Sequence, residues 1–185
     1  KHVAQVHKGD DSFYLDREGL KAEMDTFTYP LHFIDFETTM VAIPFYKGQR
    51  PYEQIAFQFS HHIMHADERV EHKGEFIETG KGVFPNFSFV RALKEELSED
   101  DGTIFRFAAH ENTVLNQIYA QLMEADPSAV PDKKVLIDFI HTITNSRSED
   151  RKGERDMVDM NRMAKDYFYD PRTKGSNSIK AILPA

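Results

Sequence analysis

The chain has 185 residues, of which 40% are hydrophobic and 12% aromatic, a composition typical of one well-buried soluble domain, and it has neither an apolar run long enough to cross a membrane nor a signal-like start. Its formal net charge of −8 argues against a broad basic surface for gripping nucleic acid, but it does not exclude a nuclease, because an acidic pocket that loads divalent ions can bind phosphate through them. The absence of Cys excludes disulfides and thiolate metal sites and fits a cytoplasmic location.

The beginning of the chain is predicted to be a lead-in, residues 1–28, to a domain that spans residues 29–185. A short amphipathic helix is expected over residues 12–27. The chain starts at Lys1 rather than Met, and it stops where another helix is predicted to begin. We therefore expect the domain to be incomplete at its C-terminus and to belong to a longer protein with further domains.

The first predicted strand, residues 33–37, contains two carboxylates inside an apolar run. Side chains two apart in a strand point to the same side, so Asp35 and Glu37 share one face and their apolar neighbours share the other. The Cα atoms of the two acids then lie roughly 6 to 7 Å apart. From that separation two carboxylates can share a divalent cation, or flank the two ions about 4 Å apart that hydrolyse phosphodiesters.

Two environments remain open for this pair of acids. An Asp and a Glu on the solvent face of an edge strand would show the same sequence pattern. Against that, Asp is depleted in strands, and the run is apolar enough for a central strand with both faces covered. In that setting the acids would be costly unless a cation relieved the cost.

The elements that follow predict a mixed α/β fold. After a loop rich in Pro and Gly, residues 54–63 alternate as a second strand, and residues 70–77 return beside it as a third strand of an antiparallel meander. Apolar residues at helical spacing then predict a helix over residues 89–97. The strand at residues 103–108 completes a crossover, which places it parallel to the first strand.

Three further helices are predicted beyond that strand, over residues 114–122, 136–143 and 160–167, with Asp159 capping the last. The polar loop at residues 144–156 carries acidic and basic residues whose charges cancel. We expect this loop to be mobile and solvated, with a clamp on substrate as the alternative.

A third acid stands where the fourth strand passes into a helix. On a parallel neighbour of the first strand, Glu111 could reach the pocket expected at Asp35 and Glu37. The alternative is an ordinary acid at a helix N-terminus, favoured by the helix dipole.

Histidines offer a competing metal proposal, because His61, His62 and His65 follow one another along the chain and His72 lies on the next strand. An extended chain sets His61 and His65 roughly 13 Å apart, too far to share zinc without a bend. We therefore expect these imidazoles to line a solvated face.

The ordered set of motifs resembles the proofreading-type (DEDD) 3′ to 5′ exonuclease superfamily, which has a ribonuclease H-like fold and four metal-binding acids spread over three motifs. The run Asp35-Phe36-Glu37-Thr38 matches its first motif, D-x-E-T. More narrowly, the chain resembles an uncharacterised bacterial family of nuclease-like proteins within that superfamily. The segments that carry this narrower resemblance are Tyr29-Pro30-Leu31, Pro51-Tyr52-Glu53-Gln54-Ile55, Phe57-Gln58-Phe59-Ser60 and Gly175-Ser176-Asn177-Ser178-Ile179-Lys180.

The resemblance implies that water activated by two Mg²⁺ or Mn²⁺ ions hydrolyses phosphodiesters at a single-stranded end of DNA or RNA. Asp35 would bridge the ions, Glu37 would help hold the ion that carries the water, and Glu111 would hold the ion at the leaving oxygen. Three further residues are expected to bind substrate, with a place in the core as the alternative for the two aromatic ones: Thr38, Tyr52 and Phe107.

Two departures from the superfamily pattern leave two functional classes open. Glu111 stands where the second motif usually supplies Asp, and the third motif, a His or Tyr followed by Asp, would fall beyond Ala185. The first class is an active metal-dependent exonuclease. The second is a ribonuclease H-like module that binds nucleic acid or a partner and has lost catalysis.

Overall fold

The structure is a computed structural model that describes residues 13–184. Contacts between Cα atoms divide the chain into two compact units, one of Thr28–Val158 and one that combines Lys1–Phe27 with Asp159–Ala185. All residues predicted to form the site lie in the larger unit. Within the described part of the chain, no helix combines the length and the apolar character needed to cross a membrane.

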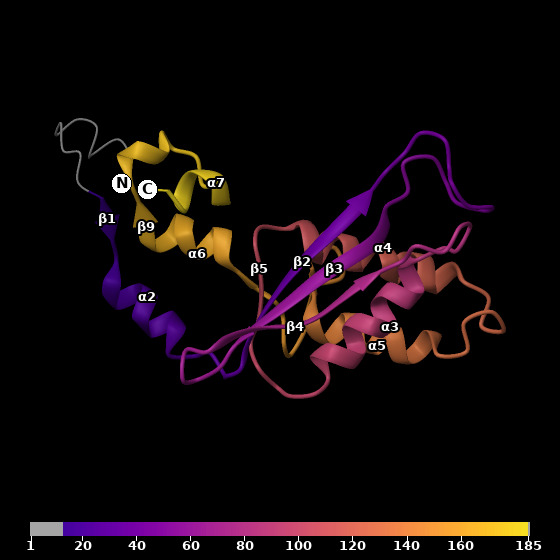
Figure 1. The fold of residues 1–185 in the computed structure, drawn as a ribbon, viewed down its shortest axis with the longest axis horizontal. Coiled ribbons are helices and arrows are strands. Elements are labelled where there is room, and N and C mark those ends of the chain that lie inside the picture. The colour runs from indigo at the N-terminus through magenta and orange to yellow at the C-terminus, as the bar shows by residue number, and fades with distance from the viewer. Residues whose placement is uncertain (1–12, 185) are drawn as a thin grey trace. The chain divides into compact units, whose positions relative to one another are not determined.

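The larger unit holds most of a five-stranded mixed sheet with the order β4-β3-β2-β5-β8, of which Figure 1 labels β2 to β5. β2 pairs antiparallel with β3 and parallel with β5, and β3 pairs antiparallel with β4. The predicted mixed α/β fold, with an antiparallel meander and a parallel crossover, is therefore confirmed. The strands are β2 Leu31–Thr39, β3 Ile55–Met64, β4 Val70–Ile77, β5 Ile104–Arg106 and β8 Val158–Asp159.

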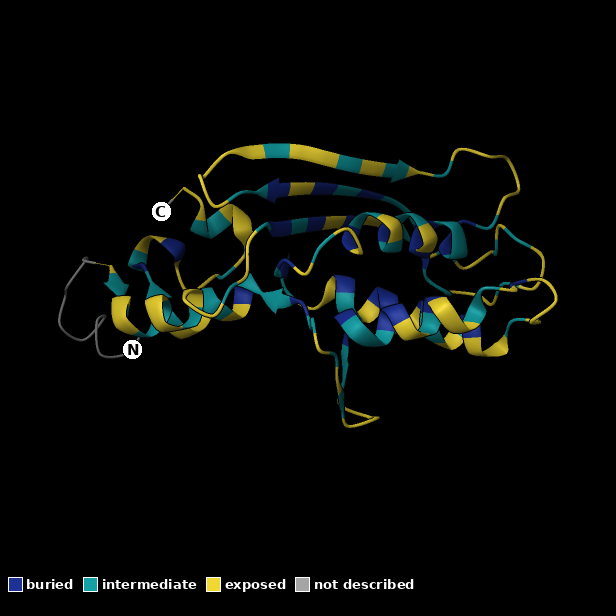
Figure 2. Ribbon diagram, turned by 90° about the horizontal axis from the view of Figure 1, so that it is seen from below, coloured by how far each residue is buried: buried dark blue, intermediate teal, exposed yellow. Residues whose placement is uncertain are grey.

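Three helices cover one face of this sheet: α3 Asn86–Leu97, α4 His110–Glu124 and α5 Lys133–Ile143 (Figure 2). They contribute most of the core, because their apolar residues recur every three or four positions and so form one stripe along each helix. From β2, Ile34 and Phe36 enter the same core, and Phe36 meets Phe89 edge to face with ring centroids 4.8 Å apart. β4 forms the sheet edge and is exposed along much of its length.

The segment at residues 144–156 is less solvated than its charge balance predicts. It contains a two-stranded hairpin of β6 Asn145–Ser146 and β7 Arg151–Lys152. The Arg151 guanidinium donates to the carbonyl of Thr144, and that of Arg155 donates to carbonyls at the end of α3 and beyond it. The expectation of a solvated loop is thus wrong for these two residues, because a guanidinium with five donors can satisfy carbonyls that a helix end leaves open.

The smaller unit is described by its own contacts. β1 and β9 pair antiparallel, and Asp159 caps α6 as predicted, accepting from the backbone N–H groups of Asn161 and Arg162. The predicted helix over residues 12–27 is confirmed as a shorter helix, and its first predicted residue lies outside the described ones. The elements are β1 Tyr14–Leu15, α2 Arg17–Met24, α6 Met160–Tyr167, β9 Phe168–Tyr169, the 3₁₀ turn η1 Pro171–Thr173 and α7 Ile179–Ile182.

Candidate active site

The two acids of the first motif lie on the face of β2 that the helices leave open. Asp35 and Glu37 are exposed, whereas Ile34 and Phe36 are 5% and 4% exposed. The alternation follows from the pleat of the strand, which sends successive side chains to opposite faces. The prediction that the two carboxylates share one face is confirmed.

Neither of the two environments left open for the acids holds in full, because they lie on a solvent-exposed face but of a central strand. β2 is central in the sheet, between β3 and β5, but only the face with the apolar residues meets the helices. The acids are therefore hydrated, and the cost of burying them gives no reason to require a cation. What remains in favour of a metal is the convergence of two oxygen-rich side chains on one open surface.

The surroundings of the acids on that face are polar. Ser60 stands opposite Asp35 in the ladder and Gln58 stands opposite Glu37, while Glu75 on β4 is the next neighbour beyond Ser60. The register shifts between Glu37 and the residue after it, which marks a β-bulge. Bulges often re-aim side chains beside functional sites, and this one lies within the D-x-E-T motif.

The end of β2 meets the start of α4. The hydroxyl Oγ1 of Thr38 is hydrogen-bonded to Nε2 of His110 at 3.2 Å. His110 begins α4, and Glu111 follows it in the first turn with only 3% of its surface exposed. The segment that carries the second predicted motif therefore lies at the end of the strand that carries the first.

The turn into α4 has an unusual backbone. Ala108 has a φ of 71°, in the left-handed region, which costs a residue other than glycine about 1 to 3 kcal/mol. The buried guanidinium of Arg106 donates to the carbonyl of Ala108 and holds the turn. Strained residues of this kind gather at functional sites, so the turn favours a functional role for the neighbouring Glu111.

The three acids do not form a ready-made metal centre. Among residues 13–184, no three His, Asp or Glu side chains gather into a group that could hold an ion. Asp35 and Glu37 nevertheless have the right chemistry for Mg²⁺ or Mn²⁺, because these ions prefer oxygen ligands. Mg²⁺ in particular is commonly held by one or two carboxylates, with water and substrate phosphates completing its shell.

The predicted stacking residues have different environments. Tyr52 is 64% exposed and has a φ of 59°, in the loop between β2 and β3, where its N–H donates to the carbonyl of Val41. A place in the core is therefore excluded for Tyr52. Phe107, just beyond β5, is half-buried. Of the three expected substrate contacts, Thr38 is hydrogen-bonded to the residue directly before Glu111.

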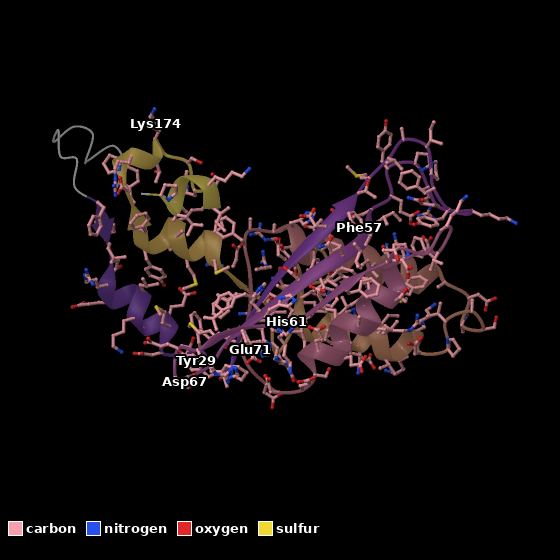
Figure 3. The ribbon with its side chains drawn as sticks, in the orientation of Figure 1. Tyr29, Phe57, His61, Asp67, Glu71 and Lys174 are labelled. Atoms are coloured by element: carbon pink, nitrogen blue, oxygen red, sulfur yellow. The ribbon has the colours of Figure 1, made fainter. Side chains whose placement is uncertain are left out.

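The histidines divide between the two faces of the sheet. His62 and His72 are exposed, as predicted, but His61 is fully buried on the helix side (Figure 3). Its Nδ1 lies 2.6 Å from Oε2 of Glu96, and its Nε2 lies 2.9 Å from Nδ1 of His32. The expectation that all these imidazoles face solvent is wrong for His61, since adjacent residues of a strand point to opposite faces.

The chain matches a known family. A family described as a domain of unknown function, DUF2779, matches residues 32–178, most of the chain. That range includes the open pair of acids, the buried histidines and the start of α4. The comparisons with curated proteins and with solved structures gave no match.

Proposed function

The chain belongs to the DUF2779 family, and from its geometry we propose that it is a metal-dependent nuclease that hydrolyses phosphodiesters of nucleic acid. The reaction class is that of the proofreading-type 3′ to 5′ exonucleases, which the D-x-E-T motif resembles. Asp35 and Glu37 would form one part of the site, and Glu111 would form the other.

The contact between Thr38 and His110 carries this proposal. It joins the last residue of the D-x-E-T motif to the residue directly before Glu111, although the two are 72 positions apart in the chain. Since β2 and β5 are parallel, their carboxyl ends lie at the same edge of the sheet. Ligands of α/β sheets bind outside that edge, so acids from the two motifs would act on one substrate there.

The position of each residue assigns it a role in the proposed reaction. Asp35 and Glu37, on the open face, would hold Mg²⁺ or Mn²⁺, which when bound would supply hydroxide near neutral pH and offset charge on the phosphate. Glu111, in the first turn of α4, would supply the metal-binding carboxylate of the second motif. The Thr38 hydroxyl, fixed by His110, would position the terminal nucleotide, and exposed Tyr52 would stack on a base of a single strand.

A second candidate function has an observation of its own. The absence of a three-ligand group among the described side chains favours a ribonuclease H-like module that binds nucleic acid or a partner without cleaving it. Such a module would still use the open face of the sheet. It would differ from the nuclease in its response to divalent ions.

The response to metal separates the two functions. We expect Mg²⁺ or Mn²⁺ to raise the melting temperature of the protein, because an ion that binds only the folded state stabilises it. Asp35→Ala should abolish this increase. Glu75→Gln removes an exposed carboxylate from the same face of the sheet and should leave it unchanged. An absence of any metal-induced increase in the wild-type protein would exclude the nuclease.

A further inference from the structure

Four ionisable side chains form a continuous hydrogen-bonded chain through the larger unit. Asp100 Oδ1 lies 2.8 Å from Nε2 of His32, and the other ring nitrogen of His32 lies 2.9 Å from Nε2 of His61. The series ends at Glu96, on α3, which is 2.6 Å from Nδ1 of His61. The two rings are 1% and 0% exposed, so this proton chain, as we name these four residues, is closed to water in its middle.

Two glycines make room for the ends of the proton chain. A Cβ atom on Gly74 would lie 2.3 Å from a carboxylate oxygen of Glu96. A Cβ atom on Gly102 would lie 2.0 Å from the carbonyl oxygen of Pro30, and also 2.6 Å from Nε2 of His32 and 2.8 Å from Oδ1 of Asp100. The absence of side chains at these two positions is therefore a condition for the four groups to meet.

The proton chain needs more protons than its neutral rings can supply. Each of its three contacts requires one hydrogen between the two atoms that it joins. Two neutral imidazoles carry one N–H each, and ionised carboxylates carry none. With only those two protons directed at the carboxylates, the lone pairs of His32 Nδ1 and His61 Nε2 would face each other at 2.9 Å. A third proton completes all three bonds and leaves a net charge of −1.

The charges around the four groups fit this count. Although burial opposes it, the N–H of Gly102 and the ring of His32 hold the pKa of Asp100 below its usual value, so Asp100 accepts as a carboxylate. Burial lowers the pKa of His61, which suits a neutral ring that donates from Nδ1 to Glu96. Both nitrogens of His32 then act as donors.

Other charged groups lie near both ends of the proton chain. The charge of Lys73 on β4 acts on His61, and Lys73 is itself paired with Glu99 at 2.7 Å. The negative charge of Glu71, also on β4, interacts with the ammonium group of Lys73. At the other end, the charge of Arg155 interacts with those of Asp100 and Asp101. The cations Lys73 and Arg155 oppose an added proton, whereas the acids favour it. The two carboxylates that touch the rings directly stabilise the added proton on the imidazoles.

We propose that Asp100, His32, His61 and Glu96 form a buried proton-binding site that takes up one proton when the protein folds and loosens the sheet from α3 when that proton is lost. The site is a pH-sensitive device built into the larger unit. It is independent of the proposed nuclease function, because none of its members lies on the open face with Asp35 and Glu37.

The sign of the pH dependence follows from counting protons. Above about pH 6.5 the histidines of the unfolded chain are neutral and its carboxylates are ionised, so the same four groups carry two protons when unfolded and three when folded. The folded state therefore binds one proton more. Its stabilising contribution is present near pH 6.5 and is lost as the pH rises, with the unfolding equilibrium constant increasing about tenfold per pH unit until the site releases its proton.

Denaturant unfolding of the whole chain across this pH range tests the proposal. The wild-type protein should show the tenfold slope, and His61→Gln should lack it because the second ring is gone. His62→Gln, at the next position of β3 but on the exposed face, should keep the wild-type slope. Glu96→Gln can still accept from His61 but removes a negative charge, so the proton should be lost at a lower pH.

NMR of the imidazole nitrogens in the wild-type protein gives a test that needs no variant to fold. At about pH 7.5, one pH unit above the usual histidine value, we expect both nitrogens of His32 to be protonated and His61 to be neutral. Two neutral rings at that pH would overturn the proposal. A wild-type stability that is flat above about pH 6.5, or a slope that His61→Gln retains, would overturn it as well.

Discussion

Ionisable residues are buried on one face of the sheet formed by β2 and β3 and exposed on the other. On the helix side, the imidazoles of His32 and His61 are buried, and each ring nitrogen has a partner. On the open side, Asp35 and Glu37 are exposed. The imidazoles come from β2 and β3 and the two acids from β2, and the pleat of the strands places the two sets on opposite faces.

The difference shows where new ligands can bind. A buried polar group whose partners are all supplied by the protein stabilises the fold, and losing one partner costs about 1 to 3 kcal/mol. An exposed carboxylate costs little to hold in place and can exchange water for a metal ion or a substrate. The helix side therefore stabilises the sheet, and the open side is the surface on which we place the chemistry.

The largest expected effect on the free energy of unfolding comes from comparing a buried apolar residue on one face of the sheet with a polar residue on the other face. Phe59→Ala should destabilise the protein by about 3 to 5 kcal/mol, because the ring is fully buried and packs against Phe89 with centroids 5.3 Å apart. Gln58→Ala, one position earlier and on the other face, should change stability by about 0.5 kcal/mol or less. Urea unfolding measures both, and similar losses would remove the contrast between the faces.

A smaller effect is expected where a side chain would intrude on the proton chain. Gly74→Ala should cost about 1 to 3 kcal/mol, because the new Cβ would displace the carboxylate of Glu96 from His61. In a Glu96→Ala background the space is already free, and the same substitution should cost much less. Equal losses in both backgrounds, measured by urea unfolding, would show that Gly74 is needed for another reason.

The smallest effect concerns an ion pair that water reaches. The hydrogen bond from Arg91 holds the pKa of Asp132 below its usual value, and the side chains are 43% and 37% exposed. Such a pair contributes at most about 1 kcal/mol, present above the unfolded carboxyl value of about 3.9 and lost as the pH falls through the lower folded value. A double-mutant cycle of Arg91→Ala and Asp132→Asn should give this coupling at neutral pH and none in strong acid. A larger coupling would show that exposed charges also stabilise this fold.

Local patterns in the sequence predicted the elements and the direction of the two acids. Alternation is enough to put Asp35 and Glu37 on one face, and helical spacing is enough to find α3, α4 and α5. The burial of His61 could not be found in this way, because its partner Glu96 is 35 positions away and the partner of His32 is 68 positions away. A polar residue is buried where the fold brings it a hydrogen-bond partner, and the residues around it in the sequence do not indicate which distant residue that partner is.

The position of Glu111 shows the same limit at the candidate site. Its strand-to-helix setting was evident from sequence, but its burial and the Thr38 contact of its neighbour depend on how β2 and β5 align. The prediction of a solvated loop fails at Arg151 and Arg155 for a similar reason. Summed charge suggested a solvated loop, whereas the carbonyls that bind these guanidinium groups become available only once α3 and α5 are formed.

The most direct test of the proposed function is hydrolysis of single-stranded DNA and RNA labelled at the 5′ end, with Mn²⁺ present. We predict stepwise shortening from a free 3′ end that is lost in Asp35→Asn and retained in Glu75→Gln. Substrates with a blocked 3′ end should persist. If the wild-type protein cleaves neither polymer, or if Asp35→Asn cleaves as fast as the wild type, the open face of β2 is not the active site that we propose.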